Sequence, residues 1–118
     1  MARVLIIDDD ATTLRMLREM LRQAKFNVFT ANSGADGIEA ARQLNPDVVV
    51  LDLMMPEING WDVCRAIRGF SNMPILVLSA VTDSQKVVHS LEAGADDYLV
   101  KPVPKGVLVA HINQLLDR

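Results

Sequence analysis

Short apolar runs alternate with longer amphipathic segments along this chain, and the alternation repeats five times. Runs of four or five mostly branched aliphatic residues favour strands that helices cover on both faces. The predicted strands are 4–7, 27–31, 48–51, 74–78 and 98–100. The second of these contains interspersed polar residues, which is typical of a strand at the edge of a sheet.

Five helices are predicted between and after these strands, because apolar residues recur there every three or four positions. The helices are expected at 12–24, 33–45, 61–68, 83–91 and 104–116. Asp10, Thr12 and Ser33 carry side-chain oxygens that can cap a helix N-terminus. Gly94 is expected to terminate the fourth helix, and Pro104 is expected in the first turn of the fifth.

The strand ends carry the polar side chains of greatest interest. Strands that alternate with helices over short connections form parallel sheets with right-handed crossovers, and ligands bind beyond the carboxyl ends of such strands. This rule places five side chains on one rim of the sheet: Asp8, Asp9, Asp52, Ser79 and Lys101. Asp52 follows the wholly apolar run at 48–51 and precedes a loop that contains Pro56, so we expect it to face a crevice.

Composition sets further bounds. The chain has 118 residues and is 50% hydrophobic, which is enough for one compact domain that spans 1–118. A net charge of −3 argues against direct binding of nucleic acid, which requires clustered Lys and Arg. Cys64 is the only cysteine, and no apolar run approaches membrane-spanning length. We therefore expect a cytoplasmic protein without a membrane anchor.

Three carboxylates close together repel one another, which raises their pKa values unless a cation neutralises them. Mg²⁺ is the expected cation, because the rim offers oxygen ligands and neither a thiolate nor a histidine. Lys101 can hold one phosphoryl oxygen, and the hydroxyl of Ser79 can donate a hydrogen bond to another. Asp52 is therefore the candidate nucleophile toward phosphorus, and its product would be an aspartyl phosphate.

Five motifs stand in register along the chain: Asp8-Asp9, Asp52 followed by Met55-Pro56 and Gly60, Ser79-Ala80, Gly94-Ala95-Asp96-Asp97-Tyr98, and Lys101-Pro102. In this order the sequence resembles, from end to end, the receiver domain of two-component response regulators, and most closely the receivers of winged-helix transcription factors. The resemblance implies a flavodoxin-like (βα)5 fold, which is a doubly wound parallel sheet in a three-layer sandwich. Its strand order, 2-1-3-4-5, is taken from known folds of this type.

The resemblance also implies a function, that of a phosphoacceptor in a two-component phosphorelay. Asp52 would receive a phosphoryl group from a sensor histidine kinase, a phosphotransfer protein or a small phosphodonor. Asp9 would bind Mg²⁺ directly with Asp8 assisting, and Asp52 and the backbone carbonyl of Met54 would complete the ligand set. Lys101 would pair with the phosphoryl group. The domain would catalyse its own phosphorylation and dephosphorylation without being a classical enzyme.

Signal output is implied for further residues. Ser79 occupies the switch position and Tyr98 the aromatic switch position, and the bond between Lys101 and Pro102 is expected to be cis. Phosphorylation would shift the face made by the fourth helix, the fifth strand and the fifth helix, through which related receivers form homodimers with cross-subunit ion pairs. The residues expected on this output face are Val87, Asp96, Asp97, Val107, His111 and Arg118.

Some positions depart from the family pattern. Val87, Val107 and His111 stand where the winged-helix branch usually carries charge, so we expect apolar contacts on the output face and an altered choice of partner. Met54 and Val81 flank the phosphorylation site, and neither side chain can orient an attacking water molecule. We therefore hypothesise that self-dephosphorylation is slow, with a lifetime of minutes or more.

Two other functions remain open. A flavodoxin-like cofactor binder would share the fold, but residues 8–14 lack the glycines and hydroxyls of a phosphate-cradling loop. The main alternative is a pseudo-receiver that acts by protein–protein interaction without phosphorylation, and the intact set of rim residues argues against it. Among the remaining residues, Met16 and Met20 are interpreted as core residues, Trp61 as a packing residue at a helix start, and His89 as a surface residue.

Overall fold

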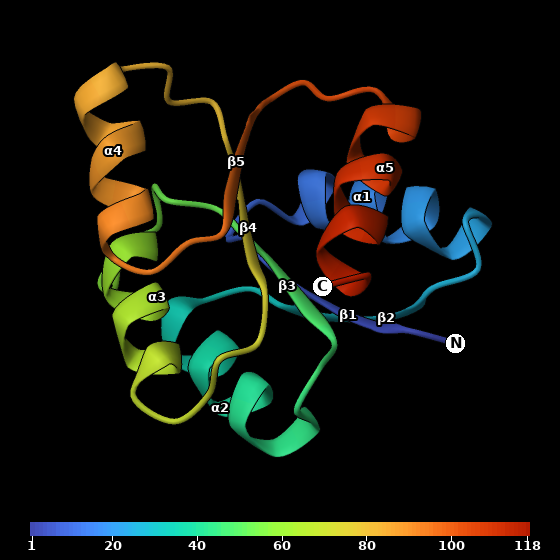
Figure 1. Ribbon diagram of the computed structural model, residues 1–118, viewed down its shortest axis with the longest axis horizontal. Coiled ribbons are helices and arrows are strands. Elements are labelled where there is room, and N and C mark those ends of the chain that lie inside the picture. The colour runs from blue at the N-terminus through green and yellow to red at the C-terminus, as the bar shows by residue number, and fades with distance from the viewer.

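One parallel sheet forms the centre of the molecule, with strand order β2-β1-β3-β4-β5 (Figure 1). The computed structural model describes all 118 residues. The strands are β1 (Arg3–Ile7), β2 (Asn27–Ala31), β3 (Val48–Leu51), β4 (Ile75–Ser79) and β5 (Asp97–Val100), and the helices are α1 (Ala11–Gln23), α2 (Gly34–Leu44), α3 (Gly60–Arg68), α4 (Ser84–Glu92) and α5 (Lys105–Leu116). The predicted fold class, the strand order and the edge position of β2 are confirmed.

Alternate residues of the strands build two hydrophobic cores, one on each face of the sheet. In β1, Val4 and Ile6 belong to the core that α1 and α5 cover, whereas Leu5 and Ile7 belong to the core that includes residues of α2 and α3. Figure 1 shows the same division, with α1 and α5 together on one side and α2, α3 and α4 on the other. Because both faces are covered, β3 is buried along its whole length, and the polar group that follows it lies beyond its end.

The helix caps agree with the sequence in part. The side chains of Ser33 and Asp83 accept hydrogen bonds from backbone N–H groups in the first turns of α2 and α4, as N-caps do. Thr12 lies inside α1 and is not a cap, so that prediction is wrong. Asp10 occupies the N-cap position, but its carboxylate accepts a hydrogen bond from the hydroxyl of Thr13 at 2.6 Å instead of a backbone N–H.

Two further expectations are wrong in detail. Pro104 is the residue that precedes α5, so it lies one position before the first turn. Met16 is 57% exposed, because Leu17 and Leu21 already fill the side of α1 that faces the sheet. Met20 is half-buried and packs against the edge of that core.

None of the five helices has both the length and the apolar character that crossing a membrane would require.

Gly37 lies where α2 packs against β1, and a Cβ atom there would come within 2.6 Å of the buried side chain of Ile7. Gly37→Ala should therefore lower the free energy of unfolding by about 1–3 kcal/mol, despite the higher helix propensity of alanine. Gly106→Ala in α5 is the matched control, because its methyl group would meet nothing within 4 Å; it should be neutral or stabilising by up to about 1 kcal/mol. Urea unfolding measures both variants, and a Gly37→Ala protein as stable as the wild type would contradict this packing.

Candidate functional site

The rim residues are held by hydrogen bonds that extend the sheet one residue beyond its strands. The backbone N–H groups of Asp8, Asp52 and Lys101 each donate to a carbonyl oxygen of the neighbouring strand, at 3.1, 2.9 and 2.9 Å. All five strands run in the same direction, so these three residues lie at one edge of the sheet. These backbone hydrogen bonds therefore fix the positions of the three Cα atoms relative to one another.

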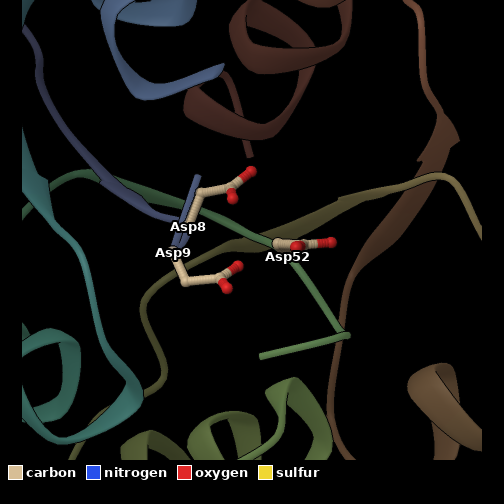
Figure 2. A group of neighbouring side chains, drawn as sticks. All are labelled: Asp8, Asp9 and Asp52. Carbon is tan, nitrogen blue, oxygen red and sulfur yellow. The ribbon is translucent and has the colours of Figure 1, made fainter. Parts of the chain in front are cut away.

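Three carboxylates converge at this edge (Figure 2). Asp8 and Asp9 extend from the end of β1 and Asp52 from the end of β3, and one carboxylate oxygen of each lies within 4.8 Å of the others. Asp8 is 2% exposed and Asp52 is 8% exposed, whereas Asp9 is open to solvent. Two of the three acids are therefore largely shielded from water.

The amine of Lys101 lies among these acids. Its Nζ is 2.6 Å from Oδ2 of Asp8 and 3.8 Å from Oδ1 of Asp52. The other oxygen of Asp8, Oδ1, accepts a hydrogen bond from the backbone N–H of Asp10 at 3.0 Å. The peptide bond between Lys101 and Pro102 is cis. Both oxygens of the buried Asp8 carboxylate therefore have a partner. The Lys101 amine is farther from Asp52 than from Asp8, so its interaction with Asp52 is weaker.

Burial raises the pKa of Asp52 above its ordinary value of 3.8. The Lys101 ammonium and the Ser79 hydroxyl act against this shift, and the neighbouring Asp8 carboxylate adds to it. The net direction means that the ionised carboxylate of Asp52 is less favourable here than in water. A carboxylate that is poorly compensated has free lone pairs and is suited to attack an electrophile.

Ser79 and Tyr98 meet at the loop that follows β4. Ser79 is 1% exposed, and its Oγ accepts a hydrogen bond from the backbone N–H of Val81 at 3.3 Å. The hydroxyl of Tyr98 donates a hydrogen bond to the backbone carbonyl of Val81 at 2.5 Å. Partial burial raises the pKa of Tyr98 above its ordinary value of 10.0, so the hydroxyl is even less ready to ionise and can donate. The two predicted switch residues therefore share one backbone partner, Val81.

The residues at the rim fit a hard divalent cation. Mg²⁺ prefers oxygen ligands such as carboxylates and keeps several of its waters. The three carboxylates offer oxygens within 4.8 Å of one another, so they could hold such an ion directly or through its waters. Met54 lies on the loop after Asp52 with its side chain 54% exposed, and the ligand role of its carbonyl stays a prediction.

The predicted output-face residues lie on α4, β5 and α5, except Asp96 just before β5 and Arg118 just after α5, and several are paired within the chain. His111 Nδ1 is 2.6 Å from Oδ2 of Asp97, and Arg118 is 2.9 Å from Oδ1 of Asp96. Val87 is half-buried and Val107 is 41% exposed. The face therefore combines exposed apolar side chains with polar pairs inside the chain, and the expectation of apolar contacts with a partner stays a prediction.

Sequence reasoning did not identify two sets of contacts, one beside the rim and one at the opposite edge of the sheet. Val81 contributes only backbone atoms, which no side-chain pattern reveals. Arg68 was missed because its role depends on tertiary contacts: it donates to the carbonyls of Met73 and Gly94 and pairs with Asp96 at 2.8 Å. It lies in the last turn of α3, where a cation is favourable whatever else it contacts.

Comparison with known proteins gives one consistent result. Residues 4–113 match the family described as the response regulator receiver domain. The DNA-binding response regulator MtrA of Mycobacterium tuberculosis is 46% identical over 116 residues, which are 98% of this chain and 51% of MtrA. The transcriptional regulatory protein AfsQ1 of Streptomyces coelicolor is 45% identical over 118 residues, which are 100% of this chain and 52% of AfsQ1. The chain thus spans about half the length of these curated relatives.

A solved structure gives the same answer at the level of the fold. The BeF3-activated N-terminal receiver domain of Klebsiella pneumoniae RstA superposes with a TM-score of 0.94 at 29% identity. The superposition covers 98% of this chain and 99% of that one. The likeness therefore includes all five strands and all five helices.

Asp52→Asn should stabilise the protein at neutral pH in the absence of divalent cations. The folded chain raises the pKa of Asp52, so the unfolded chain releases this proton first as the pH rises above 3.8, and stability falls until the folded-state pKa is passed. The variant's advantage should therefore be present at neutral pH and should vanish near the ordinary pKa. Urea unfolding in a chelator between roughly pH 4 and pH 7 measures it. Glu92→Gln, at an exposed position of α4, is the control, and an Asp52→Asn protein less stable than wild type at neutral pH would contradict the argument.

Proposed function

The chain belongs to the response regulator receiver domain family, and from this premise we propose that Asp52 accepts a phosphoryl group from the phosphohistidine of a sensor histidine kinase. The observation that carries the proposal is the convergence of three carboxylates and the Lys101 amine at one edge of the sheet. A phosphotransfer protein or a small phosphodonor would supply the same group. Related proteins with DNA-binding names support a role in signalling to a further domain or partner.

The transfer step forms one bond and breaks one bond. An oxygen of the Asp52 carboxylate attacks phosphorus, the P–N bond of the donor breaks, and the imidazole keeps the electron pair and is released with a proton. Lys101 can follow the transferred group, because its Nζ already lies 3.8 Å from Asp52. The buried hydroxyl of Ser79 can donate to another phosphoryl oxygen. Charge placed in advance in this way lowers the barrier to transfer.

A divalent cation would be held by the carboxylates of Asp8, Asp9 and Asp52, with the Met54 carbonyl as a further ligand. When bound, Mg²⁺ supplies the positive charge that allows an anionic phosphoryl group to approach an acidic rim. Asp9 is the exposed member of the set, so it provides the entry point for the ion. Asp8 contributes its carboxylate while it remains close to Lys101.

The donor's approach is supported by a hollow beside Lys101. A cavity of about 290 Å³ lies between α1 and residues 101–103, and its lining includes Met16, Met20 and Val103. An exposed methionine at this place offers adaptable apolar surface next to the reacting groups. A partner that docks there would bring its phosphohistidine to Asp52 and would cover the exposed side chain of Met16.

The output would be a shift in the population of conformations. The phosphoryl group on Asp52 draws the hydroxyl of Ser79 toward it, and the hydrogen bonds of Val81 to Ser79 and Tyr98 are rearranged. The change passes to the face formed by α4, β5 and α5, which would bind a second copy of the chain or another cytoplasmic partner. With a net charge of −3, the domain itself is not expected to bind DNA.

Incubation with acetyl phosphate and Mg²⁺ should add the mass of one phosphoryl group to the wild-type chain. Asp52→Asn should gain nothing, and a chelator should abolish the gain in the wild type. Lys101→Met should slow the reaction by about a hundredfold, because a pre-positioned charge is lost. Asp36→Asn, on the exposed side of α2, is the matched control and should react like the wild type. A folded wild-type chain that gains no mass would favour the pseudo-receiver alternative.

Loss of the phosphoryl group should take minutes or longer after the donor is removed. Neither Met54 nor Val81 offers a group that can position an attacking water molecule. Met54→Asn should shorten the lifetime severalfold, because it adds a carboxamide at a position that is 54% exposed and leaves the core unchanged. Met54→Leu is the matched control. Intact-mass spectra recorded over time give the lifetimes, and decay of the wild type within seconds would overturn this prediction.

A further inference from the structure

Helix α4 is attached to the rest of the molecule differently from the other four helices. Each of the others buries at least two residues against the sheet or a neighbouring element. In α4 only Ser90 is buried, and it is a polar residue with 1% of its surface exposed. Val88 and Leu91 remain 52% and 46% exposed. Apolar burial therefore contributes little to holding α4 in place.

The hydroxyl of Ser90 makes two hydrogen bonds instead. It donates to the backbone carbonyl of Lys86, one turn earlier in α4, at 2.9 Å. It accepts from the indole Nε1–H of Trp61 in α3, also at 2.9 Å. A hydrogen bond constrains both distance and angle, whereas apolar contact constrains only proximity. The bond between Trp61 and Ser90 therefore defines where α4 sits relative to α3.

Exposed contacts surround this buried bond. The ring of His89 lies edge-on to the ring of Trp61, with 4.8 Å between centroids and 70° between planes. A guanidinium nitrogen of Arg65 lies 3.1 Å from Nε2 of His89. Both His89 and Arg65 are exposed, so water competes for their polar groups. The directional contact that is shielded from water is the one between Trp61 and Ser90.

Trp61 is in turn attached to the loop that carries Asp52. It follows Gly60, whose N–H donates to the carbonyl of Leu53 at 2.8 Å. The backbones approach so closely here that a Cβ on Gly60 would lie 2.5 Å from the carbonyl oxygen of Asp52. The first turn of α3 therefore cannot move independently of the backbone at Asp52.

The opposite end of α4 is attached to the rim by another route. Residues 80–83 lead from Ser79 to the first turn of α4, and Val81 in this segment is bonded to the hydroxyls of Ser79 and Tyr98. Helix α4 is thus connected to the rim twice. One connection reaches its N-terminus through Val81, and the other reaches its last turn through Ser90 and Trp61.

We propose that the hydrogen bond between Trp61 and Ser90 is a pivot that holds the last turn of α4 in position and limits its displacement to the opposite end. The response to phosphorylation would then be largest in the first turn of α4 and smallest beside Ser90. Trp61 and Ser90 are positioning residues, since their polar groups bond to one another and not to the rim side chains. The statement about the response rests on the proposed function, whereas the positioning role does not.

Amide hydrogen exchange along residues 84–92 tests the positioning role in the unphosphorylated protein. Ser90→Ala should accelerate exchange in α4 severalfold. Alanine has a higher helix propensity than serine. If Ser90 had no role beyond α4 itself, Ser90→Ala would therefore slow exchange in this helix. Trp61→Phe keeps an aromatic ring and removes the donor, and it should accelerate exchange similarly. The double variant should exceed neither single variant, because both remove the same bond.

Ser84→Ala is the matched control, an exposed serine in the same helix, and it should not accelerate exchange. Unchanged or slower exchange in α4 of both Ser90→Ala and Trp61→Phe would overturn the positioning role. Additive effects in the double variant would overturn it as well, because the two side chains would then act separately.

Exchange after treatment with acetyl phosphate and Mg²⁺ tests the pivot, with occupancy of Asp52 checked by intact mass. In the wild type the change should be concentrated in the first turn of α4, and in the variants it should extend through Glu92. The rate of phosphorylation should stay within about twofold of wild type, since the rim is unaltered. The same distribution of change in all proteins would overturn the pivot. If Asp52 takes up no phosphoryl group, the proposed function and the pivot fall together, and exchange in the unphosphorylated variants still decides the positioning role.

Discussion

The central constraint on this structure is that the negative charges of two buried carboxylates must be offset at the end of an apolar sheet. Asp8 and Asp52 follow adjacent strands and are 2% and 8% exposed, so each loses most of its hydration. Lys101 is 93 residues from Asp8 in the sequence and lies 2.6 Å from its carboxylate. It follows the edge strand β5, so its side chain must reach back past β4 and β3 to the end of β1. The Lys101 amine therefore connects a residue near the N-terminus with one near the C-terminus of the chain.

The pair also gives a physical reason why Asp52, and not Asp8, is the proposed phosphoacceptor. Both oxygens of Asp8 are engaged at 3.0 Å or less, by the Asp10 amide and by Lys101. Asp52 is 3.8 Å from the amine, and its burial is only partly compensated. A partly compensated carboxylate in a shielded place costs stability. The proposed function gives that cost a role, because a bound cation and a phosphoryl group would each relieve it.

Local sequence patterns predicted most of this fold, because the central strands are apolar runs, which are stable only when helices cover both faces of the sheet. The run Val48 to Leu51 and the acids after β1 and β3 were enough to place the rim by the general rule for parallel sheets. The pattern could not tell which acid Lys101 would contact, since that depends on the path of the chain after β5. It also misplaced Met16, because periodicity identifies the apolar side of α1 without showing that Leu17 and Leu21 already fill it. The hydrogen bond between Trp61 and Ser90 could not be predicted from the apolar pattern, because it joins polar atoms of two helices that are distant in the sequence.

The attachment of α4 has an optical consequence. Trp61 is the only tryptophan in the chain, and its indole nitrogen is bonded to the one buried residue of α4. Indole emission is sensitive to the polarity and hydrogen bonding around the ring, so the tryptophan emission of this protein originates at the junction between α3 and α4. The molecule thus carries a built-in probe at the contact that holds its least buried helix, and no dye needs to be attached to observe that helix.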